Sequence, residues 1–155
     1  MSLNHDFFVV DNNFDFTNYR DYFSISSDVF LHDDFMRYIN DTLNWIPTLT
    51  TSSSELRQIK GLNLYGITVI DFNGAGKLYK IIDAWNNLLS ESPKKVILTG
   101  DWTQEYDGEG NVIGNGYYER LEFDRDDLLK HMNGLKNYSN QIVQNHSGYI
   151  LHLGI

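Results

Sequence analysis

The sequence predicts an α+β protein in which a mostly antiparallel sheet packs on helices, and three stretches carry this prediction. Residues 62–70 are apolar or β-favouring on both faces of the strand that they would form, which is typical of a central strand. Residues 78–89 repeat apolar side chains at helical spacing, and residues 95–103 return to a strand pattern. We therefore expect a strand, a helix and a second strand between residues 61 and 99, and the rest of the chain to be arranged around them.

The predicted helix has one apolar and one polar face. Its apolar positions are Leu78, Ile81, Ile82, Trp85, Leu88 and Leu89. Burying six such side chains contributes on the order of 10 kcal/mol before entropy is subtracted, at about 1.5–3 kcal/mol each. We expect this helix to dock on a sheet and to end before Pro93.

Two glycines, Gly74 and Gly76, precede the predicted helix and suggest a phosphate-binding loop at its N-terminus. The motif fails at two positions, because its first glycine would fall on Asp71 and its hydroxyl residue on Leu78. We interpret these glycines as a tight turn between strand and helix.

Ahead of this unit, the first part of the chain predicts a layer of short strands and one helix. Residues 7–10 form an apolar run that favours a strand, and the alternation in residues 14–26 allows another. Residues 33–46 predict a helix, with acidic residues in its first turn and Pro47 after its end.

A polar stretch separates this layer from the central unit. Residues 48–54 have no apolar pattern and predict an exposed loop. Residues 55–60 allow one helical turn.

The last third of the chain predicts a hairpin, a long helix and a final strand. The turn sequence at residues 107–111 connects the strand that starts at residue 95 to a return strand at residues 112–123. Asp124 is a suitable N-cap for a helix that ends at Gly148, and residues 149–153 form the last strand.

From Leu62 onward the predicted order is therefore βαββαβ, the order of ferredoxin-like folds. In that arrangement the strands at residues 62–70 and 112–123 would lie in the centre of a four-stranded sheet, with both helices on one face. We expect residues 1–60 to form an N-terminal strand and helix layer, residues 61–155 to form the βαββαβ unit, and residues 1–155 to make a single domain.

The formal net charge is −9, and the acidic residues fall into two blocks. Residues 1–46 hold eight acidic residues against two arginines, and residues 101–127 hold nine against two arginines. Such a surface repels phosphate backbones and anionic lipid, so we expect neither a nucleic-acid nor a membrane partner. A basic protein would instead be attracted by long-range electrostatic steering. The alternative is that these acidic residues only keep the protein soluble.

Composition also bears on chemistry and location. No cysteine is present, so disulfides, thiolate metal sites and cysteine catalysis are excluded. The sequence has no basic N-terminal region and no apolar run long enough for a membrane span. We expect a cytoplasmic protein.

None of the metal or catalytic motifs that we compared with the sequence fits. The five histidines form no HExxH or HxH arrangement, and we interpret His152 as a core or groove histidine instead of a metal ligand with His146. A calcium loop at residues 107–111 fails because Gly114 would stand where a bidentate carboxylate is needed. No GxSxG elbow is present. We predict no catalytic residue, no metal site and no cofactor.

The predicted hairpin carries the candidate partner-binding residues. These are Asp101, Trp102, Glu105, Tyr106, Asp107, Glu109, Tyr117 and Glu119. If Tyr106 pairs with Val112, Asp101 lies opposite Tyr117 and the carboxylates gather on one face. Aromatic side chains that bury area and keep a polar group are typical of interfaces, although they are also used to complete a core.

The leading functional prediction is an acidic binding protein that occludes a basic protein partner, as an immunity protein does with its toxin. One alternative is a small-molecule-binding protein or enzyme with a pocket that uses His152, Tyr117 and Glu119. Another is a structural subunit of a homo-oligomer.

Overall fold

The computed structural model describes residues 3–51 and 55–155 of the chain. The described strands are β1 (Asn4–Val10), β2 (Val29–His32), β3 (Pro47–Thr51), β4 (Leu56–Lys60), β5 (Ile67–Ile70), β6 (Lys95–Tyr106), β7 (Val112–Asp124) and β8 (Tyr149–Leu153). The described helices are the 3₁₀ helix η1 (Phe16–Ser24), α1 (Asp33–Tyr38), α2 (Asn40–Leu43), α3 (Phe72–Ser90) and α4 (Arg125–Asn145).

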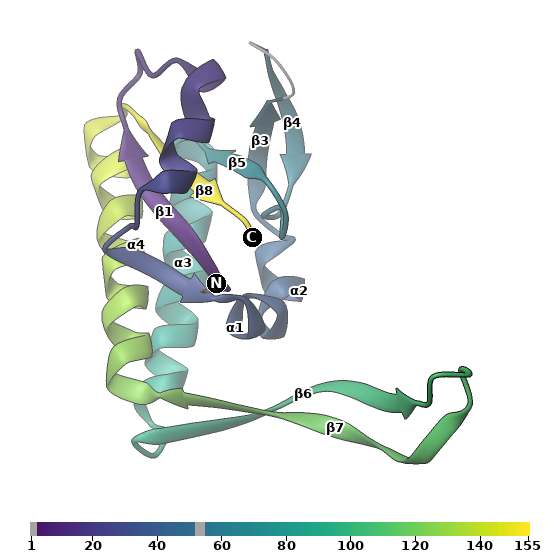
Figure 1. The fold of residues 1–155 in the computed structure, drawn as a ribbon. Coiled ribbons are helices and arrows are strands. Elements are labelled where there is room, and N and C mark those ends of the chain that lie inside the picture. Colours follow the sequence, from purple (N-terminus) through teal and green to yellow (C-terminus); the bar gives the residue numbers. More distant parts are fainter. Residues whose placement is uncertain (1–2, 52–54) are drawn as a thin grey trace.

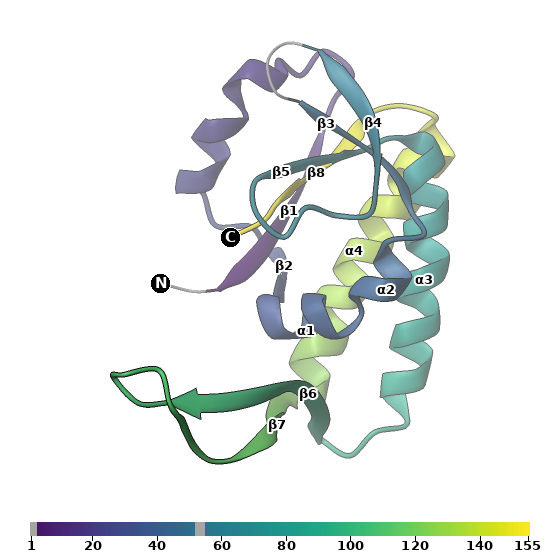
Figure 2. The same cartoon turned by 90° about the vertical axis from the view of Figure 1, so that its right-hand side faces the viewer.

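The main sheet has six strands in the order β2-β1-β8-β5-β3-β4, and every neighbouring pair is antiparallel. The long helices α3 and α4 lie side by side on one face of this sheet, and η1 lies on the other (Figures 1 and 2). The predicted α+β class, with a mostly antiparallel sheet packed on helices, is confirmed. The sheet also takes in β2, which the sequence reasoning did not anticipate.

Apolar side chains on the helix-facing side of the sheet form the larger core. Phe7 and Ile150 contribute from the sheet, and Leu78, Ile82 and Met132 contribute from the helices; all five are fully buried. The apolar face predicted for residues 78–89 therefore docks as expected, apart from Leu88, which is exposed.

A second apolar cluster lies on the opposite face of the sheet, where the side chains of Val69 and Leu151 are fully buried. Phe14 and Tyr22 pack against this cluster from the segment that contains η1. The strand predicted within residues 14–26 is therefore wrong, because the aromatic spacing there serves a short helix that covers the sheet.

The polar stretch after α2 is a hairpin at the edge of the sheet. β3 pairs with both β4 and β5, so residues 48–51 are strand and not the predicted loop; residues 52–54 of that prediction lie outside the described residues. The helical turn predicted at residues 55–60 is also wrong, since most of that segment is β4. Threonines are β-favouring, and the buried Thr48 donates a hydrogen bond to the Gly61 carbonyl at 2.6 Å, which supports a strand without an apolar pattern.

The strand predicted at residues 62–70 begins only at Ile67. Gly61 and Gly66 have φ of +75° and +88°, which takes the backbone out of the extended conformation on both sides of residues 62–65. The backbone N–H of Ile155 donates to the Leu64 carbonyl at 3.0 Å, so this segment supports the C-terminal residues instead of pairing in the sheet.

The ferredoxin-like sheet is not formed, although the order of elements after Leu62 is as predicted. Among the described strands, β6 and β7 pair only with each other, in a separate two-stranded sheet, so the strand at residues 112–123 is not central. Both long helices do lie on one face of the main sheet. In Figures 1 and 2 the β6–β7 hairpin extends away from the rest of the molecule, at the end where α3 finishes and α4 begins.

Candidate functional site

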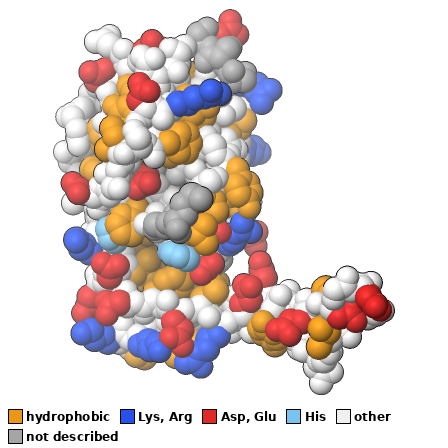
Figure 3. Space-filling view, viewed as in Figure 1, with side chains coloured by type: hydrophobic (Ala, Val, Ile, Leu, Met, Phe, Trp, Pro, Cys, Tyr) orange, Lys and Arg blue, Asp and Glu red, His pale blue; other side chains and the backbone are white. Residues whose placement is uncertain are grey.

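The hairpin made of β6, β7 and the turn at residues 107–111 is called the arm below. Its inner end is attached to the protein: Val96 and Leu121 are buried, and Phe123 packs against the larger core. From Asp101 to the turn and back to Glu119, no residue of the arm is buried. The inner end is therefore part of the folded core, while the outer part stands free in solvent (Figure 3).

The pairing of the two strands agrees with the prediction at the tip but not further in. Tyr106 pairs with Val112 as predicted, whereas Tyr117 pairs with Thr103 and not with Asp101. The register shifts between Thr103 and Glu105 and again between Thr99 and Trp102. Bulges of this kind increase local twist and change the direction of side chains, and they are common where a strand serves a function.

The outer arm exposes large apolar and aromatic side chains. Trp102 and Tyr118 are paired across the strands, with ring centroids 5.0 Å apart in an edge-to-face arrangement, and they are 57% and 62% exposed. Further exposed members are Tyr106, Val112, Ile113 and Tyr117. Large apolar and aromatic side chains gathered on an exposed two-stranded ribbon are typical of a surface that binds another molecule.

The Trp102 ring lies directly over Gly116. A Cβ atom at Gly116 would be 2.3 Å from Cζ2 of Trp102, so only glycine permits this ring position. We expect Gly116→Val to displace the Trp102 ring and shift its indole NMR signal, while the free energy of unfolding changes by less than about 1 kcal/mol because the outer arm does not pack on the core. Gly108→Val is the matched control, because nothing lies within 4 Å of a Cβ there. An unchanged Trp102 signal in the Gly116→Val variant would contradict this packing.

The carboxylates of the arm fall into paired and unpaired groups. At the inner end, Glu122 forms ion pairs with Lys95 and with Arg120, and these hydrogen bonds lower the pKa of Glu122. Asp101, Glu105 and Glu119 form no ion pair or side-chain hydrogen bond within the described part of the chain. The outer arm therefore keeps its negative charge uncompensated.

Asp107 shapes the tip of the arm. Its Oδ1 accepts hydrogen bonds from the backbone N–H groups of Glu109 and Asn111 at 2.9 and 2.8 Å, and its Oδ2 accepts one from the Asn111 side chain at 3.0 Å. These bonds, with Asn111 contributing most, lower the pKa of Asp107. Asp107 therefore holds the turn, and both Asp107 and Glu109 are exposed at the tip.

A cleft of about 350 Å³ lies between the inner end of the arm and the α1–α2 segment. Four of its lining residues are acidic: Asp34, Asp41, Asp101 and Glu119. Arg37 also lines the cleft, but its guanidinium is already bonded to Asp33 at 2.6 Å and to the Tyr65 hydroxyl at 2.9 Å. The cleft is thus predominantly negative, and its α1–α2 residues were not identified from the sequence.

A chain of polar side chains runs from this cleft into the main sheet. Asp33 bonds to Arg37 through Oδ2 and, through Oδ1, to Nε2 of His5 at 2.9 Å. Nδ1 of His5 lies 2.9 Å from Nε2 of His152, and both histidines are fully buried. Nδ1 of His152 has no hydrogen-bond partner among the described residues. Sequence reasoning singled out His152 but not the other members, which are distant from it in the chain.

The structure does not bring His152, Tyr117 and Glu119 together into one pocket. His152 is fully buried on β8 of the main sheet, whereas Tyr117 and Glu119 are exposed on β7 of the arm. Burial lowers the pKa of His152 well below its ordinary value, so this imidazole is neutral at pH 7 and inaccessible to a ligand.

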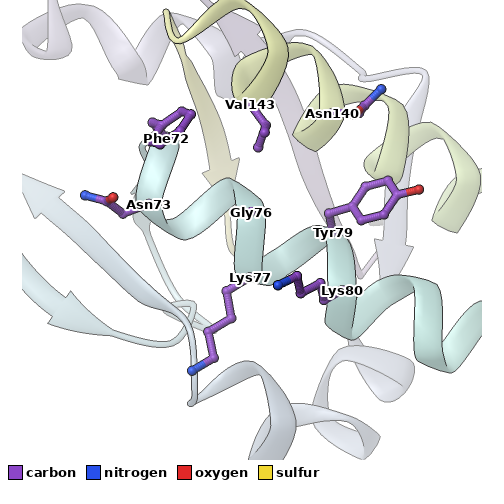
Figure 4. A pocket seen from close by; sticks show the side chains of 8 residues that line it. All are labelled: Phe72, Asn73, Gly76, Lys77, Tyr79, Lys80, Asn140 and Val143. Carbon is purple, nitrogen blue, oxygen red and sulfur yellow. The ribbon is translucent and has the colours of Figure 1, made fainter.

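A surface groove of about 640 Å³ lies over α3 and α4 near the start of α3 (Figure 4). Lys77 and Lys80 line it together with apolar side chains such as Val143. The glycines near this groove are inside α3 and not in a turn before it, since the helix begins at Phe72. Asp71 caps this end by accepting a hydrogen bond from the Gly74 N–H at 3.0 Å, so one of the N–H groups that a phosphate would use is already bonded.

Among residues 3–51 and 55–155, no cluster of three or more His, Asp or Glu side chains could hold a metal ion, and no helix is long and apolar enough to cross a membrane.

No known protein family, curated protein or solved structure matches this chain.

Proposed function

We propose that this chain is a binding protein whose arm docks on a basic protein partner. The supporting observation is the outer arm, where exposed aromatic and aliphatic side chains are interleaved with carboxylates that have no internal partner. A protein that used these residues only for solubility would not also expose Trp102 and Tyr118 beside them.

The two kinds of side chain have different tasks in such an interface. Trp102 and Tyr118 are the apolar anchors, because large rings in the centre of an interface carry most of the binding free energy. Asp101, Glu105 and Glu119 attract and orient a cationic surface, which increases the association rate and the specificity more than the affinity.

Two of the arm's unpaired carboxylates, Asp101 and Glu119, also line the cleft at its inner end, so the acidic surface continues into that cleft. A lysine or arginine of the partner that enters it would meet Asp34 and Asp41 from one side, and Asp101 and Glu119 from the other. The most concrete form of the proposal is an inhibitor that inserts its arm over a basic functional surface, as an immunity protein does with its toxin. A homo-oligomer remains the alternative use of an exposed arm, and the solution mass of the free chain distinguishes it.

The test is capture of partners from native lysate with matched baits. The triple variant Asp101→Lys, Glu105→Lys, Glu119→Lys reverses the charge at three positions of the arm. The control Asp21→Lys, Asp28→Lys, Glu91→Lys changes the net charge equally at exposed acids elsewhere. We expect the arm variant to bind the captured protein at least tenfold more weakly at 0.15 M salt and the control to stay within about threefold, because local complementarity and not net charge directs binding.

Two outcomes would contradict the proposal: no partner at any salt concentration, or equal weakening by both triple variants. Trp102→Ala separates the two parts of the interface. It should mainly speed dissociation, whereas the charge reversals should mainly slow association.

A further inference from the structure

The buried histidine pair connects the centre of the main sheet to α1, which forms one side of the cleft. His152 lies on β8 and His5 on the neighbouring β1, and their rings are nearly parallel, with 5° between the planes. Asp33, the first residue of α1, is bonded to His5, and Arg37 on the same helix both clamps Asp33 and lines the cleft. The polar chain therefore acts together with the buried Phe35 and Met36 side chains of α1 in holding this helix against the sheet.

The hydrogen bonds permit a single arrangement of protons while both imidazoles are neutral. Although burial opposes it, hydrogen bonds from His5 and Arg37 lower the pKa of Asp33, so its carboxylate is ionised and can only accept. His5 therefore donates from Nε2, and its Nδ1 accepts from the Nε2–H of His152. Nδ1 of His152 is then unprotonated.

An additional proton has no acceptable place in this chain. If His152 carries the positive charge, its Nδ1–H is buried without an acceptor. If His5 carries it, the shared proton moves to His5, and His152 must again hold a proton at Nδ1. Both cases place a cation and an unpaired N–H in a site without solvent contact, which is strongly unfavourable.

The charged groups around the pair do not remove this penalty. Asp33 and Asp6 favour a charged His5, while Arg37 opposes it. Thr68 on β5, the residue paired with His152, carries no charge. Burial outweighs the carboxylates and lowers the pKa of His5, and it lowers the pKa of His152 further.

We propose that Asp33, His5 and His152 form an acid-sensitive latch, which holds α1 and the Arg37 side of the cleft against the sheet only while both imidazoles are neutral. On acidification α1 separates from the sheet and the cleft loses one wall. Release of a basic partner by acid rests on the proposed function, whereas the latch itself does not.

The direction of the pH effect follows from the two states. In the open state the histidines titrate near pH 6.5, and in the closed state they titrate lower. Opening therefore takes up protons only below about pH 6.5, and each proton taken up multiplies the opening equilibrium constant by about ten per pH unit. Above about pH 7 the latch stays closed, and with two histidines the constant rises by up to about a hundredfold per unit of acidification.

The test is amide hydrogen exchange of residues 33–43 in the free chain at pH 7.5 and 5.5, after correction for the intrinsic exchange rate. The opening constant of the wild type should rise at least tenfold at pH 5.5. The double variant His5→Gln, His152→Gln should lose this rise, because each amide side chain keeps one donor and one acceptor but does not titrate. His146→Asn, an exposed left-handed position that suits asparagine, is the control and should keep it.

A rise below threefold in the wild type, or an equal rise in the double variant, would overturn the latch. If the double variant does not fold, the wild type still decides: the imidazole NMR signals of the fully buried His152 should not shift between pH 7.5 and 6, and a shift overturns the proposal. All measurements use the free chain, so they stand even if the arm has no basic partner.

Discussion

Replacing Asp33 by alanine should lower the free energy of unfolding by about 2–4 kcal/mol at pH 7.5. The variant leaves the Nε2–H of His5 buried without an acceptor and removes two charge-assisted hydrogen bonds. Breaking a buried ion pair typically costs about 3–5 kcal/mol, and we expect somewhat less here because the Arg37 side chain is 41% exposed and regains water.

The neighbouring Asp34→Ala is the matched control for this prediction. Asp34 is also in the first turn of α1, but its side chain is 45% exposed, and its Oδ2 only lies 3.4 Å from Nδ1 of His32, which accepts a hydrogen bond from the Asp34 backbone N–H. We expect its effect to stay below about 1 kcal/mol, the size of a charge at a helix N-terminus. Urea denaturation of both variants measures the difference in the free energy of unfolding. Similar decreases in the two variants would show that the bonds of Asp33 to His5 and Arg37 stabilise the protein no more than an exposed carboxylate does.

Alanine should have opposite effects at two glycines of α3 that are two residues apart. A Cβ at Gly74 would be 2.5 Å from the Pro47 carbonyl oxygen and 2.8 Å from Cγ2 of Ile70. Because the first of these atoms belongs to the backbone of β3, the start of α3 would have to move away from the sheet. We expect Gly74→Ala to destabilise the protein by about 2–3 kcal/mol, as other overpacked cores do.

At Gly76 the nearest atom to an added Cβ is Cγ2 of Val143, at an ordinary contact distance of 3.8 Å. Gly76→Ala should therefore stabilise the protein by about 0.5–1 kcal/mol through helix propensity and a more restricted unfolded chain. Thermal unfolding of both variants shows whether each substitution raises or lowers the stability. A stabilising Gly74→Ala would show that α3 does not approach β3 this closely.

Local patterns predicted the elements whose partners are close in sequence. The amphipathic pattern of α3, the Asp124 cap of α4 and the reversal at residues 107–111 were sufficient to place those elements. Each depends on contacts within one helix or one hairpin, and such signals are complete in a short window of sequence.

Elements whose structure depends on distant parts of the chain were the ones missed. β4 is the edge strand, and β3 beside it buries threonines in place of aliphatic side chains, so neither strand shows apolar alternation. β6 and β7 have the residues of strands that could pair in the main sheet. Their local sequence does not show that β5 pairs with β8 and β3, which leaves no place for β6 or β7 beside β5.

The candidate site was predicted only in part for the same reason. The acidic and aromatic content of the arm can be read from the sequence. That Asp101 and Glu119 are unpaired cannot, because it depends on Lys95 and Arg120 both forming their ion pairs with Glu122. His5 and His152 are 147 residues apart, and only the tertiary structure places them in hydrogen-bond contact.

The position of β8 between β1 and β5 determines when the main sheet can form. β1–β2 and β3–β4–β5 meet only through this strand, which is the last of the six to leave the ribosome. During synthesis, both halves therefore wait with unpaired edges until residues 149–153 emerge. Completing the sheet requires closing loops that span most of the chain, so folding should be slow and finish after translation has passed residue 153.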